Sequence, residues 1–227
     1  MLKFTRNRMT QLIWRRFSTT IDTVNRNAEM LATIKGYKNS QVSECANRKK
    51  MYAVVNEALG GLAISYVEFG VWRGESLRMW ATINQDSGSR FYGFDSFEGL
   101  PEVWRHGFGN ATDREMFDVA GLAPVIQDPR VMLVKGWFQR TLRSFLSKTE
   151  LRHPIVVHVD SDLHSSALYV LSTCDPLLEA GDVVIFDEYT SPSNEYLAWE
   201  EYKRAFMRKA KCLAMGDHWA QIAFVLM

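Results

Sequence analysis

Four acidic residues follow two apolar segments that neighbour each other along the chain. I-V-V-H-V-D ends at Asp160, with Asp162 two positions further on, and D-V-V-I-F-D ends at Asp187, which Glu188 follows. We interpret the segments as consecutive parallel strands, whose carboxyl ends meet at one edge of a sheet. Acids gathered in one place repel one another unless a cation offsets their charge, and carboxylate oxygens suit Mg²⁺. The pattern therefore predicts a divalent ion held by Asp160, Asp187 and Glu188.

Asp162 is the first candidate for a catalytic base at this site. A hydroxyl next to a divalent ion loses its proton more readily, and Asp162, just past its strand, is placed to accept that proton. His164 and His218 are rival bases because histidine titrates near neutral pH. His158 shares a strand face with Asp160, and we expect it to be a buried, hydrogen-bonded neighbour. The open alternative is that some of these acids cap the helices after their strands.

A glycine-containing turn comes earlier, within residues 65–81, S-Y-V-E-F-G-V-W-R-G-E-S-L-R-M-W-A. This stretch predicts a short buried strand, a turn containing Gly70 and Gly74, and an amphipathic helix. Glu68 reaches the carboxyl end of the strand, and free N–H groups around Ser76 offer positive charge to an anionic group. The spacing G-x-x-x-G differs from the G-x-G-x-x-G that cradles a pyrophosphate, so the turn and its acid favour a ligand carrying an ammonium group. The alternative is a tight turn that only packs a helix on a sheet.

The next predicted strand, R-F-Y-G-F-D, ends at Asp95, twenty-one residues beyond Gly74. An acid at that place can accept hydrogen bonds from the hydroxyls of a nucleoside ribose; the alternative is a helix or turn cap. The long segment that follows has no clear period, and such segments often form binding loops. We therefore expect Trp104, His106 and Phe108 to line a substrate pocket.

Strands that alternate with helices predict an α/β fold with a mainly parallel sheet covered on both faces. We expect the ligand-binding domain to span residues 61–227. Residues 1–60 are expected to form a basic N-terminal helical extension, in which two helices between residues 22 and 59 are broken near Gly36, with a polar link at Asn39 and Ser40.

Net charge, cysteine spacing and the length of apolar runs indicate which partners and which compartment to expect. The 227-residue chain has a net charge of +1, which by itself says nothing about a polyanionic partner; we expect no nucleic-acid partner. Its three cysteines form no C-x-x-C pair, as expected of ordinary thiols in a reducing compartment. Because no apolar run has the length of a membrane helix, we expect a soluble, cytoplasmic protein without a membrane partner. The basic N-terminal arm also suits an organelle transit peptide, but we favour an arm that forms a homodimer or higher homo-oligomer.

Five motifs of the chain resemble the macrocin O-methyltransferase family, which are class I enzymes that use S-adenosyl-L-methionine (SAM). The motifs are Y-V-E-F-G-V-W-R-G-E-S, F-Y-G-F-D-S-F-E-G-L-P-E, L-V-K-G-W-F-Q-R-T-L, H-V-D-S-D-L-H-S-S and V-V-I-F-D-E-Y, in the family's order. The resemblance implies a Rossmann-like class I methyltransferase sheet of about seven strands, mostly parallel, with an antiparallel last strand.

The resemblance also implies roles for individual residues. The expected SAM-binding residues are Glu68, Gly70, Gly74, Ser76, Asp95, Ser96, Gly136 and Trp137. Asp160, Asp187 and Glu188 would hold Mg²⁺, and Asp162 would act as the base, with His164 as a second catalytic candidate. The chain departs from the family at two places: Glu188 replaces an aspartate, and His164 replaces a tyrosine.

These features together predict a SAM-dependent, Mg²⁺-assisted O-methyltransferase that acts on a hydroxyl of a small molecule, either a sugar or a secondary metabolite. Two alternatives stay open. The run Asp160-Ser161-Asp162 is also typical of the D-x-D metal site of nucleotide-sugar glycosyltransferases. A non-catalytic protein that binds SAM but lacks productive metal geometry would share the same motifs.

Overall fold

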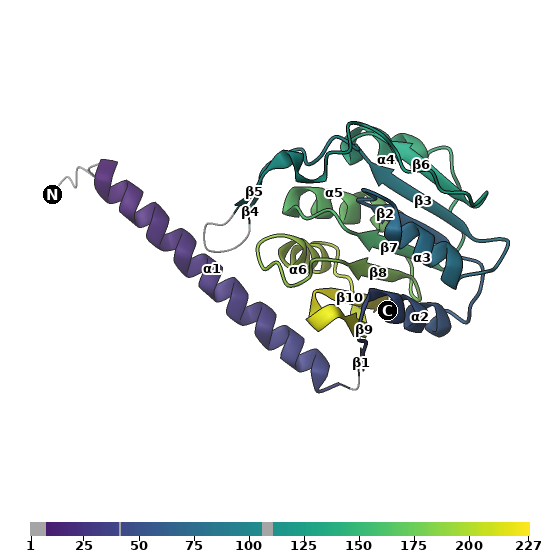
Figure 1. The fold of residues 1–227 in the computed structure, drawn as a ribbon. Coiled ribbons are helices and arrows are strands. Elements are labelled where there is room, and N and C mark those ends of the chain that lie inside the picture. Colours follow the sequence, from purple (N-terminus) through teal and green to yellow (C-terminus); the bar gives the residue numbers. More distant parts are fainter. Residues whose placement is uncertain (1–7, 41, 106–110) are drawn as a thin grey trace.

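A computed structural model of the protein describes residues 8–40, 42–105 and 111–227. The helices are α1 (Arg8–Lys38), α2 (Arg48–Ala58), α3 (Glu75–Ile83), α4 (Phe138–Leu146), α5 (His164–Cys174) and α6 (Glu195–Ala205). The strands are β1 (Ser43–Glu44), β2 (Ser65–Phe69), β3 (Arg90–Asp95), β4 (Trp104–Arg105), β5 (Ala111–Thr112), β6 (Val131–Lys135), β7 (Ile155–Val159), β8 (Val183–Phe186), β9 (Ala210–Gly216) and β10 (Gln221–Leu226). Figure 1 shows one body built on a central sheet, from which α1 extends.

The central sheet has eight strands in the order β1-β9-β10-β8-β7-β2-β3-β6. Only β10 runs antiparallel to its neighbours, β8 and β9, within this sheet. The α/β fold with an antiparallel last strand is thus confirmed. The sheet has eight strands where about seven were expected. The additional two-residue β1 pairs with the edge of β9 and is too short for a periodic pattern to reveal it.

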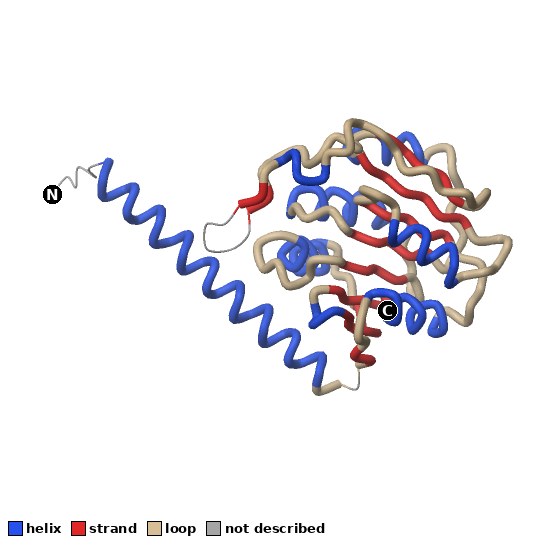
Figure 2. Tube along the Cα trace, in the orientation of Figure 1, coloured by secondary structure: helices blue, strands red, loops and turns tan. Residues whose placement is uncertain are grey.

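Two layers of helices cover the sheet, as Figure 2 shows. Strand residues alternate between faces, so Val67 and Phe69 of β2 pack in one apolar cluster together with residues of α4, α5 and α6. Tyr66 lies in the other cluster, with residues of α2 and α3. Because the neighbouring β7 is parallel and pairs Glu68 with His158, both of these polar residues lie on the α2 and α3 side.

Helix α1 is continuous to Lys38, so the predicted break near Gly36 is wrong. The break comes at the following Asn39 and Ser40, since a glycine in a helix interior costs only about 1 kcal/mol. The helix packs on the body through Met30 and Ile34, and its opposite end projects away from the sheet in Figure 1. None of the helices in the described ranges has the length and apolar character needed to cross a bilayer.

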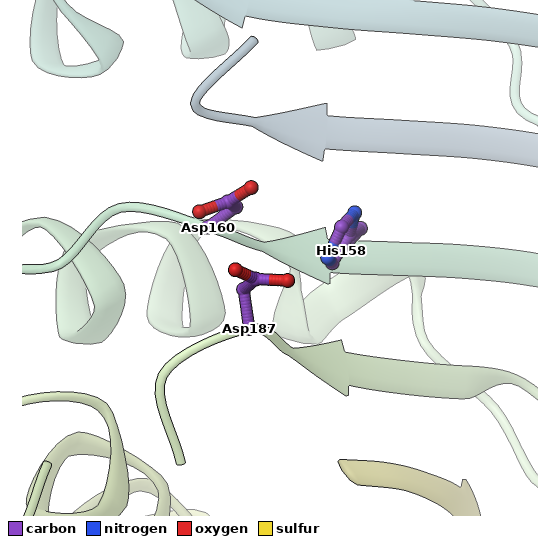
Figure 3. Close-up of side chains that lie close together, drawn as sticks. All are labelled: His158, Asp160 and Asp187. Carbon is purple, nitrogen blue, oxygen red and sulfur yellow. The ribbon is translucent and has the colours of Figure 1, made fainter. Parts of the chain in front are cut away.

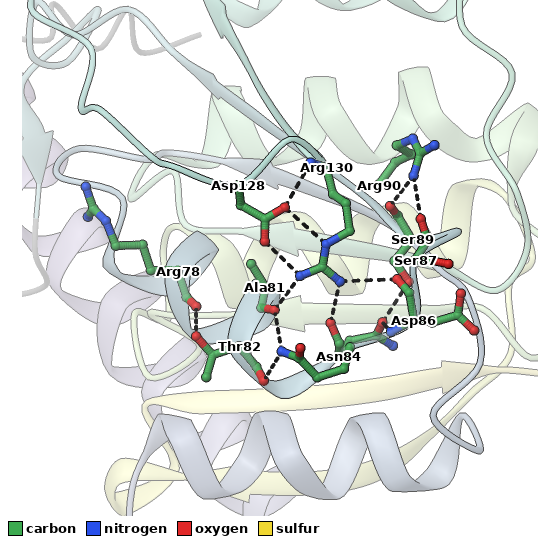
Figure 4. Close-up of polar contacts among 11 residues, drawn as sticks. Arg78, Ala81, Thr82, Asn84, Asp86, Ser87, Ser89, Arg90, Asp128 and Arg130 are labelled. Atoms are coloured by element: carbon green, nitrogen blue, oxygen red, sulfur yellow. Dashed lines mark hydrogen bonds and ion pairs between the residues drawn. The ribbon is translucent and has the colours of Figure 1, made fainter.

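Arg130, at the start of β6, ties this edge of the sheet to the end of α3 (Figure 4). Its guanidinium donates to both carboxylate oxygens of Asp128, at 3.1 and 2.7 Å. It also donates to the backbone oxygens of Ala81 (2.6 Å), Asn84 (2.8 Å) and Asp86 (3.2 Å). An arginine thus satisfies carbonyls that a helix end leaves unpaired, and it holds α3 in register with the strands beside it.

Candidate active site

A cavity of about 430 Å³ lies at the carboxyl edge of the sheet, within the roughly 300–1,000 Å³ typical of ligand sites. Loops after β2, β3, β6, β7 and β8 line it, as expected for a parallel sheet. Nine of the predicted site residues contribute to its lining: Gly70, Ser76, Asp95, Ser96, Trp137, Asp160, Asp162, Asp187 and Glu188. Trp104 lines it as well, whereas His106 and Phe108 lie outside the described residues.

Four predicted site residues do not line the cavity in the described part of the chain. Glu68 is fully buried and accepts hydrogen bonds from Ser76 Oγ (2.6 Å) and the Tyr66 hydroxyl (2.5 Å). Gly74 precedes α3 in a left-handed conformation, and the Gly136 N–H donates to the Asp95 carbonyl. These three support the cavity wall from behind.

The fourth, His164, begins α5, and its Nε2 lies 2.7 Å from Glu201 Oε2. The other rival base, His218, is exposed in the connection between β9 and β10. Neither ring is among the described residues that line the cavity.

Gly70 brings the turn after β2 against the acidic loop after β7. Its φ of +103° favours glycine, and a Cβ there would lie 1.6 Å from the Asp160 carbonyl oxygen. No side chain fits such a gap, because carbon and oxygen atoms in contact are more than 3 Å apart. Glycine at this position therefore places the turn and Asp160 side by side.

Asp95 organises the same turn. Its Oδ2 accepts the backbone N–H groups of Val71 (2.8 Å) and Trp72 (2.7 Å), and its Oδ1 accepts the N–H of Phe97 (2.7 Å). Asp95 thus caps the turn, which was the alternative to ribose binding. A carboxylate offers about four acceptor positions, so Asp95 keeps capacity for one further donor in the cavity it lines.

The acids after β7 and β8 meet as predicted. One ligand atom each from His158, Asp160 and Asp187 lies within 4.8 Å of the others, a group of described residues able to hold a metal ion (Figure 3). Glu188 lines the same cavity but lies outside this group. His158 is fully buried, and its Nδ1 lies 2.7 Å from the Tyr66 hydroxyl, which confirms the expected buried, hydrogen-bonded neighbour.

Crowding of carboxylates shifts the protonation of the cluster. Burial, followed by the charges of Asp187 and Asp162, raises the pKa of Asp160 well above its usual value. Burial and then Glu188 raise the pKa of Asp162 to about 7. Burial and Asp187 also raise the pKa of Glu188. A base with a pKa near the working pH is effective in proton transfer, so the position of Asp162 suits that role.

Glu195, at the start of α6, is a site residue that the sequence analysis missed. It is fully buried, and its Oε1 accepts the N–H groups of Ser161 (3.0 Å) and Asp162 (3.2 Å) while its Oε2 accepts that of Glu188 (2.9 Å). One carboxylate therefore joins the two acidic loops. No spacing rule could have found it, since Glu195 lies up to 34 residues from its partners along the chain.

Two further residues that we did not predict hold Asp187. Gln221 Nε2 donates to Asp187 Oδ1 at 2.7 Å, and a guanidinium nitrogen of Arg48 lies 3.5 Å from Oδ2. Arg48 lines the cavity from the start of α2. Its positive charge lies beside the acids and partly offsets their repulsion.

An apolar wall forms part of the cavity lining. Leu100 and Trp104 form a small buried cluster against which Phe117 packs, and the ring centroids of Trp72 and Phe117 lie 5.9 Å apart in an edge-to-face arrangement. These four residues all line the cavity. The cavity thus combines a polar floor with an apolar wall, as small-molecule sites do.

The model of the macrocin O-methyltransferase family matches residues 40–212, about three quarters of the chain. The chain belongs to the macrocin O-methyltransferase family. The matched range contains the glycine turn, the acidic loops and Glu195, so family membership confirms the resemblance inferred from the five motifs.

The chain is also similar to individual proteins. A Streptomyces olivaceus 8-demethyl-8-(2,3-dimethoxy-alpha-L-rhamnosyl)-tetracenomycin-C 4'-O-methyltransferase is 31% identical over 156 residues, which cover 61% of this chain and 58% of the relative. The calicheamicin methyltransferase CalS11 superposes with a TM-score of 0.60 at 22% identity, covering 78% of this chain and 77% of its own. The O-methyltransferase NovP gives 0.58 at 22%, covering 78% of both chains. These two likenesses confirm the α/β fold of the chain.

Proposed function

We propose that the chain is a SAM-dependent O-methyltransferase that methylates a hydroxyl of a small molecule, either a sugar or a secondary metabolite. One observation carries this proposal. A single cavity joins the glycine turn and Asp95, which suit a nucleoside bearing an amino-acid tail, to a cluster of carboxylates with Asp162 among them. Family membership and the named activity of the Streptomyces relative support it.

The residues around the glycine turn fit SAM. Asp95 has acceptor capacity left for a ribose hydroxyl, and the first N–H groups of α3, at Glu75 and Ser76, border the cavity without a side-chain cap. Such N–H groups favour a carboxylate. Trp137 offers a flat apolar surface on the same side, as the adenine of SAM requires.

The acidic loops fit a divalent ion. Asp160, Asp187 and Glu188 line the cavity together, and Arg48 is the cation paired with Asp187 among the described residues. One guanidinium cannot balance several carboxylates, so an ion coordinated by oxygen atoms would stabilise the cluster. Asp160 and Asp187 would hold it, with Glu188 completing the set.

The chemistry then follows from where each group lies. SAM supplies the methyl group, and a divalent ion supplies positive charge beside the acceptor oxygen. Asp162, which lines the cavity together with these acids, would accept the hydroxyl proton at its carboxylate. Leu100 and Trp104 form an apolar part of the lining that would exclude water from the acceptor, and the cavity would bring the reacting groups together, which is a main source of rate for such a transfer.

Two alternatives are less well supported. A glycosyltransferase would use Asp160 and Asp162, yet Asp160 lies against the Gly70 turn in a chain of the macrocin O-methyltransferase family. A non-catalytic SAM-binding protein would need no base, yet Asp162 is buried within the cluster.

Calorimetric titration with S-adenosylhomocysteine, with and without a divalent ion, tests the cofactor, and UDP-glucose serves as the rival ligand. We expect micromolar binding of S-adenosylhomocysteine alone. A panel of hydroxylated sugars and phenols incubated with SAM then tests turnover by mass spectrometry. Binding of only UDP-glucose would contradict the proposal. Binding of S-adenosylhomocysteine without methylation of any acceptor in the panel would favour the non-catalytic alternative.

We also propose that α1 mediates homo-oligomerisation. Its described part exposes Ile21, Val24 and Leu31, each at 45–55% of the full side-chain area, which an interface would bury. Light scattering should give a dimer or larger, and loss of that state in an Ile21→Glu, Leu31→Glu variant would support the role. A monomeric wild type would contradict it.

A further inference from the structure

His158 lies behind the acids with one ring nitrogen free. The side chain is fully buried, and no described residue makes a hydrogen bond to its Nε2. Nδ1 is engaged by the Tyr66 hydroxyl at 2.7 Å, and Figure 3 shows one nitrogen turned toward β2, which carries Tyr66, and the other toward Asp187. The free nitrogen that faces the acids is therefore Nε2.

The hydrogen-bond chain behind His158 determines where its proton lies. The Tyr66 hydroxyl has a single proton, which it donates to Glu68 Oε2 at 2.5 Å. Its oxygen must then accept from His158, so Nδ1 carries the proton. In a neutral imidazole the proton on Nδ1 leaves a lone pair on Nε2. A histidine that donates one N–H to a hydrogen-bonded partner and presents the other nitrogen to an ion is the usual arrangement of a metal ligand.

The ring is also held in place. It packs edge-to-face against Tyr52, with centroids 5.7 Å apart, and in a tilted arrangement against Tyr66, with centroids 6.0 Å apart. Ligand atoms about 2.1 Å from one ion lie roughly 3–4 Å apart, and the His158, Asp160 and Asp187 atoms lie within 4.8 Å of one another. Small side-chain movements would bring all three onto a common ion.

We propose that His158 Nε2 is a ligand of the ion, together with Asp160 and Asp187, and that the site prefers a transition-metal ion such as Mn²⁺ to Mg²⁺. The proposal rests on the metal-assisted part of the proposed function. Mg²⁺ takes oxygen ligands almost exclusively, whereas imidazole nitrogen suits transition metals and carboxylates suit Mn²⁺. A mixed set of one nitrogen and two carboxylates therefore favours the transition metal.

Pulsed electron paramagnetic resonance of the Mn²⁺-loaded protein without SAM tests the ligand directly. Electron spin echo modulation should show coupling to nitrogen-14, which changes to nitrogen-15 coupling when the protein is labelled with ¹⁵N-histidine. The coupling should vanish in His158→Asn and persist in the asparagine variants of the other four histidines, His106, His153, His164 and His218. Persistence in those four variants assigns the nitrogen to His158 even if His158→Asn does not fold.

Competition between Mn²⁺ and Mg²⁺ supplies the second measurement. We expect Mn²⁺ to bind at least about tenfold more tightly than Mg²⁺, and His158→Asn to lose about tenfold or more in Mn²⁺ affinity. Bound Mn²⁺ without nitrogen coupling, coupling that survives in His158→Asn, or no Mn²⁺ binding would each overturn the proposal. S-adenosylhomocysteine binding and methyl transfer, measured in parallel, would still stand in those cases and keep the proposed function separate.

Discussion

Removal of the Glu195 carboxylate should break the connection between the two acidic loops and destabilise the protein. Glu195→Ala leaves three backbone N–H groups without their acceptor, and each unsatisfied buried group costs about 1–3 kcal/mol. The loss of a buried carboxylate that Asp162 repels offsets part of this cost, since burial and then Asp162 raise the pKa of Glu195 well above its usual value. We expect the free energy of unfolding to fall by about 3–5 kcal/mol.

Glu195→Gln distinguishes the contacts to one loop from the contact to the other. An amide oxygen at the Oε1 position can still accept from Ser161 and Asp162, but the amide nitrogen would face the N–H of Glu188. We therefore expect a loss of about 1–2 kcal/mol. Glu201→Gln is the matched control, because Glu201 is on the same helix, is 43% exposed and pairs only with His164 among the described residues; it should cost less than about 1 kcal/mol.

Urea unfolding at pH 7 measures all three variants against the wild type. A loss of stability that is largest in Glu195→Ala, smaller in Glu195→Gln and smallest in the Glu201→Gln control would support the role of Glu195. If Glu195→Ala stays within about 1 kcal/mol of the wild type, the buried carboxylate does not join the loops and the reasoning is refuted.

Three further outcomes follow from the same geometry. Gly70→Ala should lower the free energy of unfolding by more than about 3 kcal/mol, because its Cβ meets the Asp160 carbonyl oxygen at 1.6 Å. Gly36→Ala is the control: with open space around its Cβ, it should stabilise the protein by about 0.4–1 kcal/mol. Equal melting temperatures of the two variants would contradict this prediction. Asp160→Asn or Asp187→Asn should abolish turnover while S-adenosylhomocysteine affinity stays within a few-fold, and unchanged turnover in both would exclude the metal-assisted mechanism. In metal-free protein the pKa of Asp162 is about 7, against 3.8 for an ordinary aspartate, so Asp162 ionises first in the unfolded chain as the pH rises. The free energy of unfolding should therefore fall by up to about 4 kcal/mol between pH 4 and 7. Urea titrations across that range should show a smaller fall in Asp162→Asn.

The sequence predicted the parts of the site that follow from strand periodicity. Asp160 and Asp187 end consecutive buried strands, and parallel strands bring their carboxyl ends together, so their meeting could be expected. The glycine turn after β2 and Asp95 after β3 follow the same logic. The antiparallel last strand came from the resemblance to the macrocin O-methyltransferase family.

Contacts set by side-chain direction could not be read in this way. Glu195 joins the loops only because α6 begins with its first side chain pointing inward, and Arg48 reaches Asp187 from a helix that precedes the first long strand. Asp95 satisfies three N–H groups, a role that its position after β3 does not distinguish from ribose binding. The two-residue β1 falls below the length at which alternation carries information.

A crystal structure of the protein with S-adenosylhomocysteine and Mn²⁺, with anomalous data at the manganese edge, would locate both the cofactor and the ion. We expect S-adenosylhomocysteine along the Gly70 turn with its ribose at Asp95, and an anomalous peak between Asp160 and Asp187 on the side of His158. Absence of the cofactor from this cavity, or a peak away from both aspartates, would contradict it.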